Sequence, residues 1–525
     1  MLVHFRPIFL GFVFLALGIF LMSLFTFSSH LYLIIPLIGF VVYFLVVGCA
    51  RLFSEKFFAY IKKSLVYMLV CVVAFGAGVG LFALTKAEYK ADFVPLETTP
   101  YQVTGVIDGH VLSNNSAKYF FLENVHLYSE DEDVKLERNL RVYVANDIAN
   151  ECSLDDIKSG DQVFFSAYIK ITPVFRKNSI DSFAYKNNFQ HTAYIFSPNI
   201  YYVDGKANLM DITKNAVHQL YEDNFDPLYA GFAYSIISGD RSELDHEMIS
   251  QFSRVGIAHI VAISGLHVGF LVLLLLWPLN RLRLNKWIKL TIVINVLLLY
   301  AIFCGASPSV VRACIMAIIL LIGNLFGKQN DNLNNVSLAG ILILLISPLF
   351  LFDLGFLLSF AGVFGIFCLY PVLKRALRFL RWKWLIESLA VTLSADIATL
   401  PIIANAFGYV SLVSSISNLV LVPIFGFVFM LLFVLTILCL LLPFLGVLLK
   451  VCQWGLMVVE RGASYLASLP FASFNYHGFS PGALIAYYAG MFSLSRYVVP
   501  KYKVKVALIS ACYATFLIIV LISFI

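Results

Sequence analysis

The sequence predicts a polytopic α-helical membrane protein that carries an inserted, small extracytoplasmic β domain. Hydrophobic residues make up 60% of the 525-residue chain and charged residues only 13%, about half the charged fraction of an average soluble domain. Apolar runs of about 20 residues, the length that crosses a bilayer as a helix, recur along the chain. One long polar stretch, 85–205, interrupts them with short segments rich in Val, Tyr and Phe.

Three candidate spans open the chain. The first is long, is followed at once by another and has no A-x-A cleavage site, so we expect an anchor rather than a signal peptide. The pair 410–424 and 425–442 is joined through Pro423 and Gly426, and one broken or re-entrant element is an alternative to two spans. The candidates are 8–27, 31–50, 64–84, 256–278, 287–305, 308–326, 336–352, 354–372, 386–404, 410–424, 425–442, 480–498 and 504–525.

Basic loop residues predict the orientation, because Lys and Arg accumulate on the cytoplasmic side. All four basic loops can lie on the cytoplasmic side given the number of candidate spans. This placement puts the N-terminus inside and both 85–205 and the C-terminus outside. We therefore expect a multi-pass protein of the cytoplasmic (inner) membrane, with domains 1–84, 85–205 and 206–525. The four loops contain Arg51, Lys56, Lys62 and Lys63; Arg281, Arg283, Lys286 and Lys289; Lys374, Arg375, Arg378, Arg381 and Lys383; and Arg496, Lys501, Lys503 and Lys505.

The polar stretch 85–205 is predicted to be a small barrel or sandwich of roughly five strands. Its segments YQVTGVI, KYFFLENVHLY, LRVYVA and DQVFFSAYIKI are separated by turn residues such as Asp108-Gly109 and Ser159-Gly160-Asp161. The acidic run SEDEDVKLE indicates a solvated loop, so this surface is not uniformly suited to DNA.

Amphipathic segments follow the β domain. ITKNAVHQLYEDNF and SELDHEMISQFSRVG are predicted to be helices at the membrane interface, divided by the apolar YAGFAYSII and the turn SGDRS. Residues 445–468 show a similar pattern, with Glu460-Arg461 on the polar side.

The stretch HIVAISGLHVGF, 259–270, carries polar residues within an apolar run. Ser264 and Gly265 weaken a helix, and non-helical backbone at membrane depth survives only beside protein or water. His259 and His267 are eight positions apart, about 80° around a helix, so they suit one side of a cavity but not a shared metal ion. The alternative is that both histidines only bond to neighbouring helices.

Arg312 and Asp396 are ionisable residues within apolar spans. Arg312 lies four residues after Pro308, and Asp353 is a candidate partner at the same end. A charge at the bilayer centre costs about 2.5–3.5 kcal/mol on insertion scales, so such residues usually face protein or a hydrated path. Asp396, followed by Pro401, is expected to do the same. Snorkelling of Arg312 to the interface is the alternative.

Two further patterns are less specific. KRALRFLRWKW, 374–384, places cations at helical spacing with tryptophans between them, which favours an anchor at the inner leaflet over a nucleic-acid contact. Gly76 and Gly80 form a G-x-x-x-G helix-packing pattern.

The sequence lacks the common catalytic and metal-binding motifs. No H-E-x-x-H, G-x-S-x-G or P-loop is present. The nine cysteines contain no C-x-x-C and are expected to be buried apolar residues. We expect no catalytic residue, no cofactor and no metal site.

GDRSELDHEMISQFSRVGIAHIVAISGLHVGF resembles the signature of the ComEC family, the membrane channel proteins of natural transformation. YAIFCGASPSVVRACIMA, NLNNVSLAGILILLISPLFLFDLGFLLSFAGVFGI and LPIIANAFGYVSLVSSISNLVLVP extend the resemblance in order. GDQVFFSAYIKITPVFRKNSIDSFAYKNNF resembles the end of the external domain, an OB-type barrel, which implies an OB-like fold here.

The resemblance implies a DNA path. The family moves one DNA strand across the cytoplasmic membrane, so the candidate path residues are His259, Ser264, Gly265, His267, Arg312 and Asp396. Structural or gating candidates are Asp240, Arg241 and Asp353. The implied partners are single-stranded DNA, the lipid bilayer, a DNA receptor, a separate nuclease and cytosolic translocase or single-strand-binding proteins. A homodimer is an open alternative.

One departure from the family concerns DNA degradation. Many members continue into a metallo-β-lactamase-like domain, whereas this sequence stops at Ile525 and has no H-x-H-x-D-H motif. We therefore expect this chain not to degrade DNA.

Two other classes of function remain as alternatives. A secondary transporter of a small solute also uses broken helices and midplane charges. An intramembrane enzyme would use His259, His267 and Asp396 as acid–base groups. For the barrel aromatics, stacking on single-stranded DNA and packing in the core are both open. These aromatics are Tyr119, Phe120, Phe164, Phe165 and Tyr168.

Overall fold

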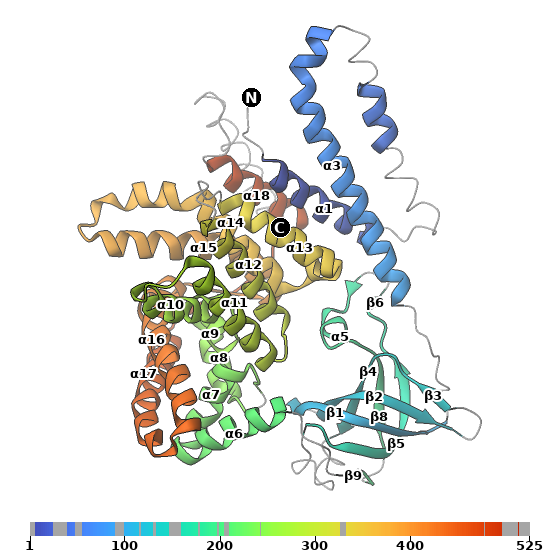
Figure 1. Ribbon diagram of the computed structural model, residues 1–525, viewed down its shortest axis with the longest axis vertical. Helices are drawn as coiled ribbons and strands as arrows, with labels where there is room; N and C mark the ends of the chain where they lie inside the picture. The colour runs from blue at the N-terminus through green and yellow to red at the C-terminus, as the bar shows by residue number, and fades with distance from the viewer. Residues whose placement is uncertain are drawn as a thin grey trace. The chain divides into compact units, whose positions relative to one another are not determined.

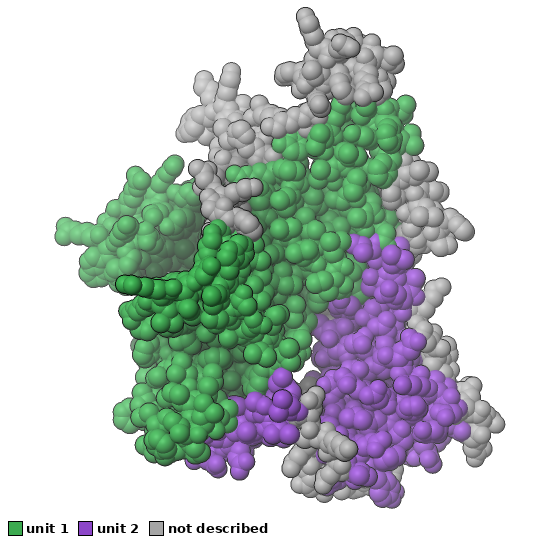
Figure 2. All heavy atoms as spheres, in the orientation of Figure 1, with its two compact units in different colours: residues 1–80, 224–239, 244–525 green, residues 81–223, 240–243 purple. Residues whose placement is uncertain are grey.

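The computed structural model contains two compact units of the chain (Figure 2). The first comprises residues 1–80, 224–239 and 244–525, and the second comprises 81–223 and 240–243. The residues that the structure describes are 6–24, 39–47, 55–89, 99–114, 117–129, 133–145, 159–176, 179–196, 199–203, 209–241, 243–325, 332–476, 478–495 and 513.

Several expected features lie outside the described residues. They are the span at 504–525 apart from Tyr513, most of the span at 31–50, the cysteines Cys49, Cys152 and Cys512, and the loop residues Arg51, Arg496, Lys501, Lys503 and Lys505.

Seven helices among the described residues are long and apolar enough to cross a membrane (Figure 1). They confirm the expected multi-span architecture. The seven are α1 (Pro7–Leu24), α3 (Glu55–Glu88), α11 (Lys286–Phe303), α14 (Leu354–Ala376) with the 3₁₀ turn η3 (Leu377–Phe379), α15 (Lys383–Phe407), α16 (Ser414–Leu441), and η4 (Pro443–Leu448) with α17 (Leu449–Ala467).

The first unit also contains shorter apolar helices. They lie in α10 (Gly265–Arg281), α12 (Pro308–Leu325) and α13 (Asn332–Ile346). Helix α18 (Pro481–Leu494) belongs to the same unit. The expected span at 336–352 is wrong, because α13 ends at Ile346 and Pro348 begins the 3₁₀ helix η2 (Pro348–Phe352). Ser347 is extended, with φ −154°, as expected for a residue before proline.

Helix α16 is a single element of 28 residues, so the break expected near Pro423 and Gly426 is wrong. A proline costs a helix one hydrogen bond, which the packing of neighbours can offset. Gly426 makes room for a neighbouring helix and does not break α16, because a Cβ at this position would overlap the ring of Phe270 on α10. The glycine therefore lets α10 and α16 approach closely.

The segment after the β domain forms α6 (Leu209–Asn224), α7 (Pro227–Ser238) and α8 (His246–Arg254). Every residue of α7 from Tyr229 to Ser238 is buried, so α7 is a core helix and not the apolar link between interface helices that the sequence suggested. Residues 445–468, expected at the interface, form most of η4 and α17 and count among the seven helices able to cross a membrane.

The second unit is a closed five-stranded β-barrel (Figure 1). The ring order is β1-β2-β4-β8-β5, and β1 closes it by pairing with β5. All neighbours in the ring are antiparallel except β4 and β8. This arrangement confirms the expected OB-like barrel. The strands are β1 (Tyr101–Asn114), β2 (Ala117–Tyr128), β4 (Asn139–Ala145), β5 (Gln162–Ile171) and β8 (Phe189–Ile195), with shorter β3 (Asp133–Lys135), β6 (Phe175–Arg176), β7 (Ser179–Ile180) and β9 (Tyr201–Val203).

Side chains alternate between the barrel interior and its surface, as strand geometry requires. Phe120 and Phe165 are buried in the core, whereas Phe164 is on the outside. Tyr119 and Tyr168 are only partly buried. Of the five barrel aromatics that could pack in the core or stack on DNA, the alternation thus places some in the core and others at the surface.

The expected turn at Asp108-Gly109 is wrong. Both residues lie inside the long strand β1, at a register shift between Asp108 and Leu112 against β2. Gly109 has φ +82°, a conformation that favours glycine. The pair therefore forms a bulge within the strand. The other expected turn is present at Ser159-Gly160.

Close packing of α1 on α3 depends on two glycines. A Cβ at Gly18 would overlap the backbone of Phe75, and a Cβ at Gly78 would overlap that of Leu15. Gly80, part of the G-x-x-x-G pattern, would have nothing within 4 Å of an added Cβ. The packing pair is thus Gly18 and Gly78, a small-residue contact of the kind common between membrane helices.

We expect Gly78→Val to destabilise the α1–α3 contact by about 1–3 kcal/mol, because the added atoms force the two backbones apart. Thermal unfolding of the purified protein in detergent measures this. Gly80→Val, two residues along the same helix, is the matched control and should change the midpoint little. Equal effects of the two variants would contradict this packing.

Candidate functional site

A break separates two helices in the stretch HIVAISGLHVGF. The short α9 (Ala258–Val261) ends with Ala262 as its C-cap, and α10 begins at Gly265 after the extended residue Ser264. The candidate span at 256–278 is therefore interrupted, at the position where Ser264 and Gly265 were expected to weaken the helix. The break needs partners for the free N–H groups at the start of α10, because a bilayer offers none.

Ser264 and His267 supply those partners as a capping box. The Ser264 Oγ accepts the N–H of Leu266 at 3.3 Å, and the His267 Nδ1 accepts the N–H of Ser264 at 3.2 Å. Since Nδ1 accepts, the proton of the neutral ring is on Nε2. His267 is fully buried, and its ring packs edge-to-face with Phe425 and Phe429 of α16, at centroid distances of 5.3 and 4.9 Å.

The motif is held between α12 and α16. A Cβ added to Gly265 would lie 3.9 Å from the Cβ of Ala313 on α12. Gly256, with φ +79°, packs so closely on Ser414 at the start of α16 that an added Cβ would overlap it. The motif therefore contacts the helix that carries Arg312 and the helix bonded to Asp396.

Arg312 and Asp353 form a buried ion pair, as the sequence suggested. The Arg312 Nη1 lies 2.7 Å from the Asp353 Oδ2, and the two side chains are 3% and 2% exposed. Arg312 Nη2 also donates to the Ser309 Oγ at 3.2 Å. Asp353 is the N-cap of α14 and accepts the N–H of Phe356 at 3.1 Å. The pair therefore links α12 to the start of α14.

Glycine at position 355 leaves room for this pair. A Cβ there would lie 2.6 Å from the Arg312 Nη2 and 3.1 Å from the Asp353 Oδ2. The backbone of α14 thus approaches the guanidinium directly. Any side chain at Gly355 would have to displace one member of the pair.

Asp396 binds the start of α16. Its Oδ2 accepts hydrogen bonds from the Ser414 Oγ at 3.0 Å and the Ser415 Oγ at 2.7 Å. A carboxylate beside a helix N-terminus is also favoured by the positive end of the helix dipole. Asp396 is half-buried, and its described partners are hydroxyls and not a cation.

The remaining candidates are placed differently. His259 lies half-buried in α9, Asp240 is half-buried after the left-handed Gly239, and Arg241 is exposed. The roles expected for the candidate path and gating residues stay predictions, because the geometry gives their positions and not their function.

His267 and Asp396 meet α16 at different heights. His267 contacts Phe425 and Phe429, whereas Asp396 bonds to Ser414 and Ser415. Ten residues of helix span roughly 15 Å. His267 and Asp396 therefore do not share one reacting centre in this arrangement.

Sequence reasoning missed a polar contact between α7 and α17. Gln453 donates to the Asp226 Oδ2 at 2.5 Å and accepts the backbone N–H of Asp226 at 3.3 Å, and Lys450 lies 3.9 Å from the same carboxylate. Tyr229 donates to Glu460 at 3.4 Å. Glu460 was noted as polar on its helix, but its partner is 231 residues away, which no local pattern indicates.

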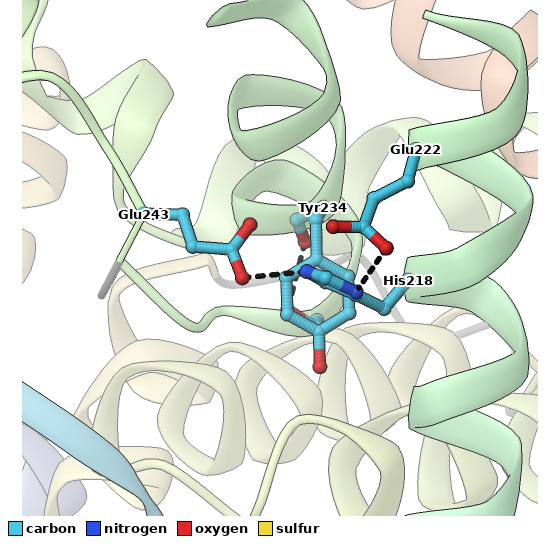
Figure 3. A network of polar contacts seen from close by, with 5 residues as sticks. His218, Glu222, Tyr234 and Glu243 are labelled. Carbon is cyan, nitrogen blue, oxygen red and sulfur yellow. Dashed lines mark hydrogen bonds and ion pairs between the residues drawn. The ribbon is translucent and has the colours of Figure 1, made fainter. Parts of the chain in front are cut away.

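A second missed cluster joins His218 of α6 to two carboxylates (Figure 3). The His218 Nε2 lies 2.5 Å from the Glu243 Oε1, and Nδ1 lies 3.5 Å from the Glu222 Oε2. The i,i+4 spacing of His218 and Glu222 was readable from the sequence, but the contact with Glu243 was not. Among the described residues, no group of three or more His, Cys, Asp or Glu is arranged to hold a metal ion.

Comparison with known proteins identifies the region that contains the motif. The model of the family described as "Competence protein" matches residues 236–501, about half of the chain. The match includes the capping box, the Arg312–Asp353 pair and Asp396.

Relatives of the chain are found in several bacteria. ComE operon protein 3 of Bacillus subtilis (strain 168) is 31% identical over 38% of this chain and 25% of its own length. An uncharacterized protein of Aquifex aeolicus (strain VF5) is 28% identical over 46% of this chain and 54% of its own. An uncharacterized protein of Mycoplasma pneumoniae is 30% identical over 34% of this chain and 44% of its own. The chain thus spans between a quarter and about half of these relatives, and no solved structure matches it.

We expect Arg312→Gln to destabilise the protein by about 3–5 kcal/mol, because it leaves the carboxylate of Asp353 buried without its cation. Adding Asp353→Asn should restore most of the stability, since neither charge remains and asparagine still caps α14. Thermal unfolding in detergent and the protein level in membranes measure both. A single variant as stable as the double variant would show that the pair contributes little.

Proposed function

We propose, from the premise that the chain belongs to the competence protein family, that it moves single-stranded DNA across the cytoplasmic membrane during natural transformation. A role in competence DNA uptake is supported by the family and by the B. subtilis relative. The single-stranded form of the cargo and its passage through the bilayer go further than this support.

The observation that carries the proposal is a row of tyrosines across the barrel surface. The strand register places Tyr119 of β2 opposite Tyr143 of β4, Tyr143 opposite Tyr194 of β8, and Tyr194 opposite Tyr168 of β5. Phe196 continues the row, with its ring 5.0 Å from that of Tyr168. These five residues are called the tyrosine row below, and each is partly or well exposed.

Such a row suits a single strand with unpaired bases. Each base offers a π-face, and stacking on an aromatic side chain contributes about 1–3 kcal/mol per base whatever the sequence. The rings of Tyr143 and Tyr194 are 5.6 Å apart, and the Lys170 ammonium lies 5.8 Å from the Tyr194 ring. Burial raises the pKa of Tyr119, partly offset by Arg141, so its hydroxyl stays neutral beside phosphates at physiological pH.

Passage through the first unit needs a hydrated path with cations, because a strand carries one charge per nucleotide. Arg312 is the candidate cation, and Asp353 neutralises it in this arrangement. Transport on this scheme requires the pair to separate, so that Arg312 meets a phosphate in place of the carboxylate. The capping box, held between α12 and α16, would fix the adjacent wall of this hydrated path.

The proposal assigns the chain no catalytic role. DNA capture by a receptor, removal of the second strand by a nuclease, and handling of the entering strand by a translocase or single-strand-binding protein would belong to partner proteins. Assembly as a homodimer is compatible with this scheme. Because the relatives are matched over only part of their length, their whole activity is not carried over.

The orientation that we propose puts the barrel outside the cell and the loop after α14 inside, since this loop is basic. In a variant without native cysteines, Ser129→Cys should react with an impermeant thiol reagent added to intact cells. Ala376→Cys should react only after the membrane is opened. The reverse labelling would overturn the orientation.

Uptake of labelled DNA by competent cells tests the function with two variants. Replacing Tyr143, Tyr194 and Phe196 by alanine should lower DNA binding by the purified protein by about a hundredfold or more, for three lost stacking contacts, and should lower DNA entry with it. Arg312→Gln with Asp353→Asn should lower entry but leave DNA binding unchanged, because the barrel is intact.

The controls are the protein level in membranes and the uptake of labelled small solutes. Full DNA entry by the double variant at normal protein level would show that Arg312 is only structural. Unchanged DNA entry together with reduced solute uptake would favour the alternative of a secondary transporter.

A further inference from the structure

The turn between α14 and α15 forms a basic and aromatic tip. Residues 374–386 contain five Lys or Arg and no Asp or Glu. Helices α14 and α15 pack side by side, and their membrane-capable segments Leu354–Phe379 and Lys383–Phe407 are separated by three residues. Wherever these helices cross a bilayer, the tip therefore lies at its surface.

The cations of the tip are available to an outside anion. Arg375, Arg378 and Arg381 are exposed and form no ion pair with any described residue. Lys374 is different, because it lies 2.8 Å from Glu387 and 3.1 Å from the Tyr370 hydroxyl. This pair joins the two helices and leaves the three arginines uncompensated at the tip, beside the exposed Lys383, whose charge also acts on Glu387.

Three large apolar side chains accompany the cations. Phe379, Trp382 and Trp384 are 78%, 64% and 61% exposed. The two tryptophan rings are nearly parallel, with centroids 6.3 Å apart and planes 13° apart. Aromatic rings that expose so much area at the end of a membrane helix match the headgroup region, where one part of the side chain is apolar and the other wet.

We propose that the α14–α15 tip, made of Arg375, Arg378, Phe379, Arg381, Trp382, Lys383 and Trp384, is a binding surface for anionic phospholipid headgroups. The guanidinium groups contact the lipid phosphates, and the aromatic rings lie between headgroups and acyl chains. Each cation near an anionic leaflet contributes roughly a fivefold gain in affinity. The tip thus selects anionic over zwitterionic lipid, a property independent of whether the chain carries DNA.

Quenching of tryptophan fluorescence by brominated lipid tests this in the full chain. Trp277, Trp287 and Trp454 are replaced by phenylalanine, so that Trp382 and Trp384 report. At equal mole fraction in mixed vesicles, brominated phosphatidylglycerol should quench at least twice as strongly as brominated phosphatidylcholine. About 1 M salt should remove the preference, because the Debye length falls to about 3 Å.

Variants assign the preference to the tip. Replacing Arg375, Arg378, Arg381 and Lys383 by glutamine should abolish it, whereas changing the three arginines to lysine should keep it, since charge is retained. The matched control removes four cations from the second unit and should retain the preference for the anionic lipid. Its substitutions are Lys135→Gln, Lys170→Gln, Lys186→Gln and Lys214→Gln.

Equal quenching by the two lipids in the parent protein would overturn the proposal without any variant. A preference that survives the glutamine variant would do the same. If the glutamine variant instead loses binding of a single-stranded oligonucleotide and keeps the lipid preference, the tip binds nucleic acid and the proposal is wrong.

Discussion

The constraint on which the first unit depends is that a bilayer supplies no hydrogen bonds, so each polar group at membrane depth needs a partner within the protein. The break before α10 is possible because Ser264 and His267 cap the new helix. The charge of Arg312 is tolerated because Asp353 lies 2.7 Å away. Asp396 is satisfied by two serine hydroxyls at the start of α16. Each of these solutions ties one helix end to a neighbouring helix, so the polar residues also position the bundle.

The same polar groups connect the local structure to the proposed transport. A buried ion pair adds little to net stability, because desolvation of the two charges offsets most of their attraction. Removing only one partner is costly, because the other charge stays buried. A pair of this kind is therefore suited to exchange one anion for another. The guanidinium of Arg312 also donates to Ser309, and it packs close to Gly355, where there is no room for a side chain. A phosphate entering here would meet a preorganised cation.

The second unit depends on closure of the sheet. Pairing of β1 with β5 removes the free strand edges and fixes which side chains face outward. Because register sets the rows across strands, four tyrosines from four strands lie on one line of the surface. A shift of one residue in β4 would turn Tyr143 into the core and put Val142 or Val144 in the row. The surface that we assign to DNA is thus a consequence of register and not of composition.

The sequence by itself determined the class of the protein. Apolar runs, the β-rich interval at 85–205 and the Arg312–Asp353 pairing were readable, because hydrophobic period, strand alternation and the cost of a lone intramembrane charge are local or compositional properties. The tertiary structure alone decided the rest. Gly78, not Gly80, proved to be the packing glycine on α3, and Phe120 went to the core while Tyr119 stayed outside. His267 proved to be a cap, α16 ran unbroken through Pro423, and Glu460 found Tyr229 across 231 residues. These outcomes depend on which face of each element meets a distant neighbour, and that information arises only when the elements pack.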